Sequence, residues 1–217
     1  MEILLKKPAS IRSIPPDQIT DEDIVETYRL ESMLFPAAHV PGPELSRSWY
    51  AHNPLTLLGV RDIASGRLIG FLQVLPINDA LFETIKRGHF DDTKFSVDDI
   101  VLYDRPGAYK LYIASFCIHP DYNSNLQFFK TMYNTFFDML VDLARERGVV
   151  VTEVVADGIT EKGRLLCRGM GLKKQTASSH GSDVYYGVIF PRGKATVRLK
   201  GEPGKRLLAV YEEIGMA

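Results

Sequence analysis

Residues 111–122 read LYIASFCIHPDY, an apolar and aromatic run that stops at a proline. This composition favours a β-strand, and Pro120 cannot continue the strand because it lacks the amide hydrogen that a sheet ladder needs. We therefore predict a strand from Tyr109 to Ile118, followed by a sharp turn.

A long helix and a second strand follow this turn. Apolar residues recur at three- and four-residue steps, and Gly148 provides a stop signal. Val149 to Val155 is short and β-branched, as in a buried strand. The order strand, helix, strand predicts a parallel βαβ unit. The helix positions expected to form the core face are Phe129, Met132, Tyr133, Phe136, Phe137, Leu140, Val141 and Ala144.

The flanking sequence adds further elements on both sides of this unit. Upstream, two helices are expected before any strand, and Ser65-Gly66 favours the reversal of an antiparallel hairpin. Downstream, one short helix, two strands and a terminal helix are expected. The predicted helices are 21–32, 44–52, 160–168 and 205–213, and the predicted strands are 55–60, 68–75, 172–178 and 184–190.

Two segments lie outside this regular pattern. The connection 76–108, with a helix expected at Asp79 to Arg87, holds seven acidic and four basic residues, which predicts a solvated excursion. Such long connections serve either as binding elements or as decoration. The C-terminal segment 191–217 is rich in glycine and charge, and we expect a solvated tail there.

The composition limits the classes of function. A chain of 217 residues with 45% hydrophobic residues can fill the core of a single domain. Its formal charge of -1 argues against nucleic acid as a partner. Cys117 and Cys167 lie far apart with no metal-ligand spacing, so we expect reduced thiols and no metal site. With neither a signal peptide nor a membrane span in the sequence, the expected location is the cytoplasm.

The order of the elements from about 21 to 190 resembles the GNAT N-acyltransferase superfamily. Three local sequences carry this resemblance: residues 111–122, the long helix after them, and GRLLCRGMGL at 163–172. The resemblance implies an α/β, GNAT-like (acyl-CoA N-acyltransferase) fold with a mixed central sheet and helices on both faces. It also implies a single domain over residues 1–190 with an insertion at about 76–108, followed by a C-terminal extension over 191–217.

The resemblance implies acetyl-CoA or a related acyl-CoA as co-substrate. In the family, two central strands separate, and the freed backbone binds the pantetheine; a glycine-rich loop Q/R-x-x-G-x-G/A at the helix start then holds the pyrophosphate. Here every expected glycine of that loop is absent, so either an altered loop binds CoA or the segment is an ordinary helix start. The implied cofactor-binding residues are Phe116, Cys117, Ile118, Asn123, Ser124, Asn125, Leu126, Gln127 and Phe128.

Three residues are candidates for catalysis. Cys167 stands four residues before Gly171, where many family members carry a tyrosine that protonates the departing thiolate, although a free cysteine is more often a buried apolar residue. His119 and Glu153 lie beside the expected separation of the strands. Either one can accept a proton from the amine, or it can serve the structure alone.

The resulting prediction is acyl transfer to a primary amine on a small molecule or a peptide, with a homodimer as one state of the protein. A second hypothesis is a GNAT-like domain that has lost catalysis and serves as a binding or regulatory module. A third is recognition of nucleic acid through the basic run from Arg192 to Arg206, which predicts a strong salt dependence.

Overall fold

The protein is described by a computed structural model that covers residues 10–122 and 126–215. The predicted cofactor-binding residues Asn123, Ser124 and Asn125 lie outside the described residues.

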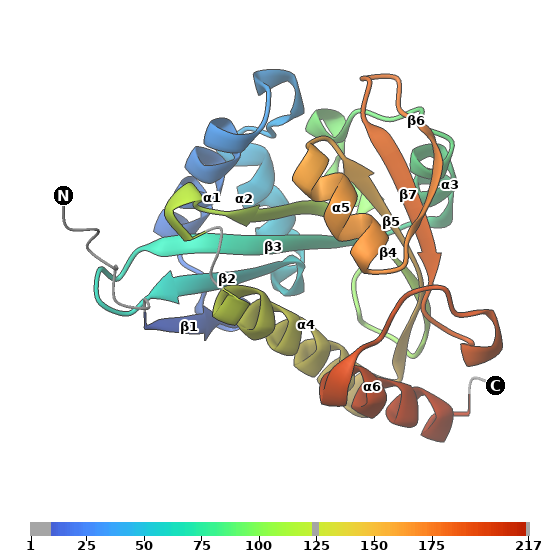
Figure 1. Cartoon of the computed structure of the whole chain (residues 1–217). Helices are drawn as coiled ribbons and strands as arrows, with labels where there is room; N and C mark the ends of the chain where they lie inside the picture. The colour runs from blue at the N-terminus through green and yellow to red at the C-terminus, as the bar shows by residue number, and fades with distance from the viewer. Residues whose placement is uncertain (1–9, 123–125, 216–217) are drawn as a thin grey trace.

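Seven strands form one sheet in the order β1-β2-β3-β4-β5-β7-β6 (Figure 1). The pair β4 and β5 is parallel, and every other neighbouring pair is antiparallel. The predicted mixed sheet and its βαβ unit are therefore confirmed. The strands are β1 (Ile11–Ile14), β2 (Leu57–Asp62), β3 (Leu68–Ile77), β4 (Gly107–Ile118), β5 (Val149–Gly158), β6 (Lys173–Ala177) and β7 (Asp183–Val188).

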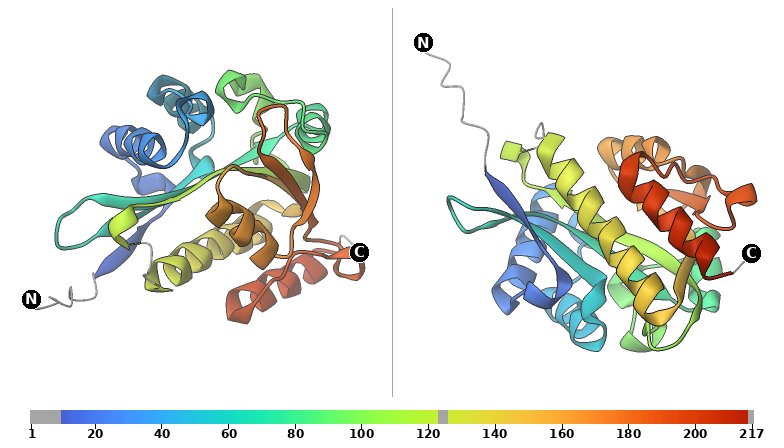
Figure 2. Two further views of the ribbon diagram at one scale, coloured as in Figure 1. Left: turned by 45° about the horizontal axis from the view of Figure 1, so that its top comes forward. Right: turned by 90° about the horizontal axis from the view of Figure 1, so that it is seen from below.

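The α-helices cover both faces of the sheet, as predicted (Figure 2). Helices α1, α2 and α3 form one layer, and α4, α5 and α6 form the other. Short 3-10 turns link several of these elements. The helices are α1 (Asp21–Leu34), α2 (Pro43–His52), α3 (Asp79–Lys86), α4 (Leu126–Arg147), α5 (Glu161–Gly169) and α6 (Gly201–Glu213).

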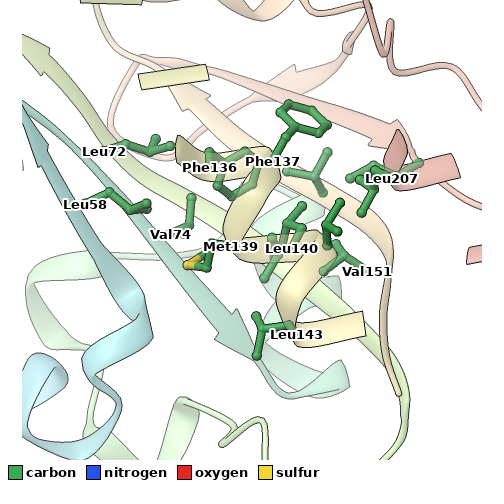
Figure 3. Close-up of a cluster of buried hydrophobic side chains, with 14 of the residues drawn as sticks. Leu58, Leu72, Val74, Phe136, Phe137, Met139, Leu140, Leu143, Val151 and Leu207 are labelled. Carbon is green, nitrogen blue, oxygen red and sulfur yellow. The ribbon is translucent and has the colours of Figure 1, made fainter. Parts of the chain in front are cut away.

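Helix α4 packs its apolar face into the largest core cluster (Figure 3). Met132, Phe136 and Leu140 recur at four-residue steps and are all buried, which confirms the predicted core face of this helix. Full burial of each such side chain contributes roughly 1.5–3 kcal/mol. The helix therefore fixes β4 and β5, which it connects, in one rigid unit.

The prediction that two helices precede any strand is wrong, because β1 comes first. It adds an edge strand to β2, with Ile14 opposite Gly59. The sequence Ile-Arg-Ser-Ile of β1 is too short for its periodicity to be recognised, and its pairing depends on β2, which lies far along the chain.

The prediction of a solvated excursion at 76–108 is also wrong. Phe82, Phe90 and Phe95 are buried in a second core cluster on the α2 side of the sheet. The indole Nε1 of Trp49 donates a hydrogen bond to the Phe95 carbonyl at 3.2 Å, which links α2 to this segment. The aromatic residues, rather than the more numerous charges, decide the position of this segment.

The C-terminal segment is not a solvated tail throughout. Helix α6 begins at Gly201, four residues before its predicted start, and buries Leu207, Val210 and Tyr211. The Val151 amide donates a hydrogen bond to the Tyr211 hydroxyl at 3.0 Å. Helix α6 therefore belongs to the same core as α4 and β5.

Candidate functional site

Strands β4 and β5 separate at their carboxyl ends. Their pairing runs from Gly107 opposite Val149 to Ile113 opposite Ala156. Past that pair, β4 continues along β3, and β5 continues along β7. We call the residues 114–118 and 157–158 the open end, and the paired residues 107–113 and 149–156 the closed end.

A β-bulge in β4 shapes the open end. Gln73 of β3 lies opposite Ser115, and the next residue, Val74, lies opposite Ile113, so Ala114 is the extra residue. A bulge shifts the alternation of side chains along a strand. Tyr112 and Ser115 consequently both face the layer of α1, α2 and α3, where Tyr112 is buried and Ser115 is hydrogen bonded to α1.

The first turn of α4 lies beside the open end on the opposite face of the sheet. The ring of Phe116 stacks on that of Phe129, with centroids 5.8 Å apart and planes 12° apart, and it meets the Phe128 ring at 6.1 Å. The amino end of this 22-residue helix carries a partial positive charge that suits an anion. The structure thus brings together the two parts of the predicted cofactor site that it describes.

Phe128 belongs to the core of the protein. Its side chain is fully buried, and its ring lies so close to Gly70 of β3 that a Cβ at Gly70 would clash with it. Leu126, by contrast, is 84% exposed. Of the predicted cofactor-binding residues in this turn, Phe128 therefore has only its backbone to offer a ligand.

Both cysteines are free and buried. Burial raises the pKa of Cys117 well above the ordinary value of a thiol. Burial, helped by the charge of Asp157, raises the pKa of Cys167 to about 12. Both thiols are protonated at neutral pH, and Cys167 is a weak acid.

Glu153 and His119 lie at different ends of the β4 and β5 pair. Glu153 is at the closed end, opposite Lys110, whose Nζ lies 3.5 Å from a Glu153 carboxylate oxygen. The Tyr186 hydroxyl donates a second bond to Glu153 at 2.7 Å. His119 directly follows the open end, and its Nδ1 accepts a bond from the Asp121 amide at 3.3 Å.

The sequence analysis missed three carboxylates on the α1 side of the sheet: Glu31 and Asp157 lie at the open end, and Asp92 bonds to Tyr112 in the adjoining part of the closed end. Each comes from a different segment, and each accepts a hydrogen bond from a hydroxyl group. The charge of Asp92 also raises the pKa of Glu31 and that of Asp157. The pairs are Glu31 with Ser115, Asp92 with Tyr112 at 2.9 Å, and Asp157 with Ser182 at 2.7 Å.

Desolvation dominates the electrostatics of these carboxylates. Burial raises the pKa of Glu31 to about 7 and that of Asp157 to about 6, and it also raises the pKa of Asp92. No described lysine or arginine forms an ion pair with any of the three. Oδ1 of Asp157 is buried and has no hydrogen-bond partner among the described residues.

Two histidines from distant loops lie near this group of carboxylates. The rings of His39, between α1 and α2, and His180, between β6 and β7, meet edge to face with centroids 5.9 Å apart. Positive charge on His39 opposes the rise in the pKa of Asp92, and charge on His180 opposes the rise for Asp157. The loops at the two sides of the sheet therefore meet beside the acids.

Two of the three missed acids left a signal in the sequence. Glu31 follows Ile24 and Thr27 at helical spacing, on a face whose other members are buried. Asp157 directly ends the apolar run of β5. Asp92 gave no local signal, because its burial depends on how the segment 76–108 packs against Tyr112.

The described residues provide neither a metal-binding cluster nor a membrane-spanning helix. Within residues 10–122 and 126–215, no group of three or more His, Cys, Asp or Glu side chains is arranged to hold a metal ion. No helix in this described part of the chain has the length and apolar character needed to cross a membrane.

No family model matches the sequence, and no curated protein matches it significantly. Solved structures do match, at low identity. Arabidopsis thaliana NAA60, in complex with a bisubstrate analogue, is 14% identical, with a TM-score of 0.51 over 82% of this chain and 97% of its own. The NatC complex bound to Gag peptide and CoA is 13% identical, with a TM-score of 0.53 over 82% of this chain and 96% of the matched chain. The GNAT-like decarboxylase GphF, in complex with isobutyryl-CoA, is 14% identical, with a TM-score of 0.50 over 82% of this chain and 97% of its own.

These similarities establish the architecture: the chain has the GNAT fold, as the sequence predicted. They do not identify the reaction, since the matched structures include both a complex with a bisubstrate analogue and a decarboxylase. The chemistry has to be argued from the open end itself.

Proposed function

We propose that the protein is an N-acyltransferase that moves an acyl group from acetyl-CoA, or a related acyl-CoA, to a primary amine of a small molecule or a peptide. One observation carries this proposal. The open end of β4 and β5 has the amino end of α4 on one face. On the other face are the buried carboxylates Glu31 and Asp157, with Asp92 beside them, and no described lysine or arginine forms an ion pair with any of the three. This arrangement suits an anionic acyl-CoA on one face and a cationic amine on the other.

The co-substrate would bind along β4 and at the start of α4. Backbone groups of Phe116, Cys117 and Ile118 lie where β4 has lost β5 as a partner, and pantetheine amides can bond to them. The first turn of α4, with Leu126, Gln127 and Phe128, would face the pyrophosphate. The NatC and GphF structures, which contain CoA and isobutyryl-CoA, support this use of the fold.

The chemistry needs a base on the acceptor side. The amine nitrogen attacks the thioester carbonyl carbon, the carbon–sulfur bond breaks, and an amide forms. The nitrogen gives up a proton, and the departing sulfur gains one. An alkyl amine has an ordinary pKa near 10, so a base must take its proton at neutral pH.

Asp157 is the base that the geometry favours. It lies at the open end itself, and a pKa of about 6 leaves it ionised at neutral pH while still able to accept a proton. Its Oδ2 is held by the Ser182 hydroxyl, and its Oδ1 has no partner among the described residues. Glu31 and Asp92 would attract the protonated amine before it reacts.

The residues that the sequence analysis selected fit the reaction unequally. Glu153 is already engaged by Lys110 and Tyr186 at the closed end, away from the proposed path of the amine. His119 stays a second candidate base. Cys167 stays the proposed proton donor, but a pKa of about 12 makes proton transfer to a thiolate unfavourable, so its contribution would be small.

One observation favours the second candidate function, a non-catalytic binding module. Phe128 and Leu126 place large side chains in the helix turn where the family uses glycine. The Phe128 ring is fully buried and packs directly against Gly70. If this turn excludes CoA, the domain retains the fold without the chemistry.

Calorimetric titration with acetyl-CoA and with free CoA separates the two functions. An acyltransferase should bind both with micromolar affinity and release free thiol in a screen of primary amines. An absence of heat and of thermal stabilisation at millimolar CoA would support the binding module instead.

A further inference from the structure

A basic pocket lies apart from the open end, behind the carboxyl end of α5. It has a volume of about 430 Å³, within the range of small-molecule sites. The end of α5 and the start of β6 form one wall, and the segment that leads into α6 forms the other. The lining residues are Arg168, Gly171, Leu172, Lys173, Ala195, Thr196 and Arg198.

The charge of this pocket has one sign. Arg168, Lys173 and Arg198 line it, and none of the other described lining residues is acidic. Arg168 has an ion pair with Glu161 at 3.4 Å, which is exposed to solvent. Neither Lys173 nor Arg198 has an ion pair within the described part of the chain. The fold thus brings together three cations from two segments, and within the described residues two of them have no anionic partner.

The two walls are held together by backbone contacts. The Arg198 amide donates a hydrogen bond to the Met170 carbonyl at 2.7 Å. Gly171 has a φ of +85°, and a Cβ there would clash with the Thr196 carbonyl oxygen. Because glycine is required at this contact, the position of the Arg198 side chain opposite Arg168 and Lys173 is built into the fold.

We propose that this pocket binds the phosphate group of a small phosphorylated ligand. Arginine guanidinium groups bind phosphate oxygens in pairs of parallel hydrogen bonds, and a lysine adds a third positive charge. The pocket is large enough for a phosphate with part of the molecule that carries it. Phosphate binding in this pocket does not require acyl transfer; the inference rests on the proposed function only where the phosphate is that of CoA.

Two kinds of molecule can supply this phosphate. It belongs either to the 3′-phosphate of a CoA molecule bound at the open end or to an independent phosphorylated molecule. A short path connects the pocket to the open end. Arg168 Nη1 donates to the Tyr185 hydroxyl at 3.3 Å, and the Tyr185 ring lies against Gly158.

The first test is a calorimetric titration with inorganic pyrophosphate, which does not depend on acyl transfer. We expect millimolar or tighter binding that Arg198→Gln weakens at least tenfold. Arg145→Gln, the same change at an exposed position of α4, should leave the binding unchanged. Absence of binding to the wild-type protein, or an equal loss in both variants, would overturn the proposal.

The second test identifies the source of the phosphate by comparing CoA with dephospho-CoA. If the phosphate comes from CoA, then CoA should bind at least tenfold more tightly than dephospho-CoA, and Arg198→Gln should remove that difference. If the source is a separate molecule, the two should bind alike, and pyrophosphate should still bind to the CoA-saturated protein. Salt-sensitive binding of an RNA oligomer, weakened equally by Arg198→Gln and Arg145→Gln, would instead indicate a diffuse basic surface and contradict a phosphate pocket. The pyrophosphate result stands even if the protein transfers no acyl group.

Discussion

The two ends of the β4 and β5 pair differ in how their charged side chains are paired. At the closed end, Lys110 lies 3.0 Å from Asp79 and 3.5 Å from Glu153, so these charges are satisfied within the protein. At the open end, Glu31 and Asp157 are buried and accept hydrogen bonds from hydroxyl groups, and neither has an ion pair with a described lysine or arginine. Because an ionised carboxylate loses its hydration on burial, the second arrangement is costly without a cation. On this ground we propose the open end as the place where a cationic ligand completes the electrostatics.

The largest expected effect comes from Asp157→Asn. If Asp157 is the base, this change should lower turnover by about 10²–10⁴-fold, the usual contribution of a positioned base, with little change in acetyl-CoA affinity. Glu153→Gln, on the same strand but at the closed end, is the matched control and should lose less than about threefold. Steady-state kinetics of the two variants measure these losses of turnover. A larger loss in Glu153→Gln than in Asp157→Asn would identify Glu153 as the base instead.

The pH dependence of turnover gives an independent check of the same residue. A base works in its ionised form, so the rate should rise with pH through about 6 and then level off. This inflection should disappear in Asp157→Asn and persist in Glu153→Gln. A rate that does not change between pH 5 and 8 would remove Asp157 as the base.

The next largest effect is on folding stability at Glu31. Its pKa is raised from 4.5 to about 7, so the native state binds a proton that the unfolded chain has lost between those values. The stability of the wild-type protein should therefore fall as pH rises through this window. Glu31→Gln should raise the free energy of unfolding at pH 8 by about 3 kcal/mol, and this gain should vanish below pH 4.5.

Urea unfolding at several pH values measures this effect. Glu22→Gln, on an exposed position of the same helix, is the matched control and should show no such pH-dependent gain. A destabilised Glu31→Gln variant at pH 8 would mean that the ionised carboxylate has a cationic partner that the described contacts do not show.

The contrast between the two ends also explains what the sequence could predict. The βαβ unit was visible because the faces of α4 and the β-branched run of β5 are local patterns. Glu153 was selected because it lies in an evident strand, beside the expected separation, whereas the point at which β4 and β5 part depends on their register and lies beyond it. Asp92 was hidden because its burial depends on aromatic residues such as Phe95 packing against a strand that comes later in the chain. Local patterns reveal elements, whereas the grouping of acids from three segments is a tertiary property.

A smaller effect is expected for Cys167→Ala. Because burial raises the pKa of this thiol to about 12, we expect at most a tenfold loss of turnover, with unchanged CoA affinity. Removal of the buried sulfur should also cost about 1 kcal/mol of stability. A loss of turnover beyond a hundredfold in a folded variant would identify Cys167 as the main proton donor.

The smallest effect is expected for Gln127→Glu in the first turn of α4. A negative charge close to the pyrophosphate should weaken CoA binding by about two- to fivefold, in keeping with the size of charge effects at helix ends. Gln175→Glu, the same change on the exposed strand β6, is the control. Equal affinities for both variants in calorimetry would place the pyrophosphate away from α4.

Hydrogen exchange measured by mass spectrometry, with and without acetyl-CoA, tests the central distinction between the two ends most directly. The account predicts that acetyl-CoA slows exchange in peptides that cover the open-end residues 114–118 and the start of α4. Peptides from the closed end of β4, residues 107–112, should exchange at the same rate in both conditions. Protection confined to the closed end, or no protection anywhere at saturating acetyl-CoA, would contradict the assignment of the open end as the functional site.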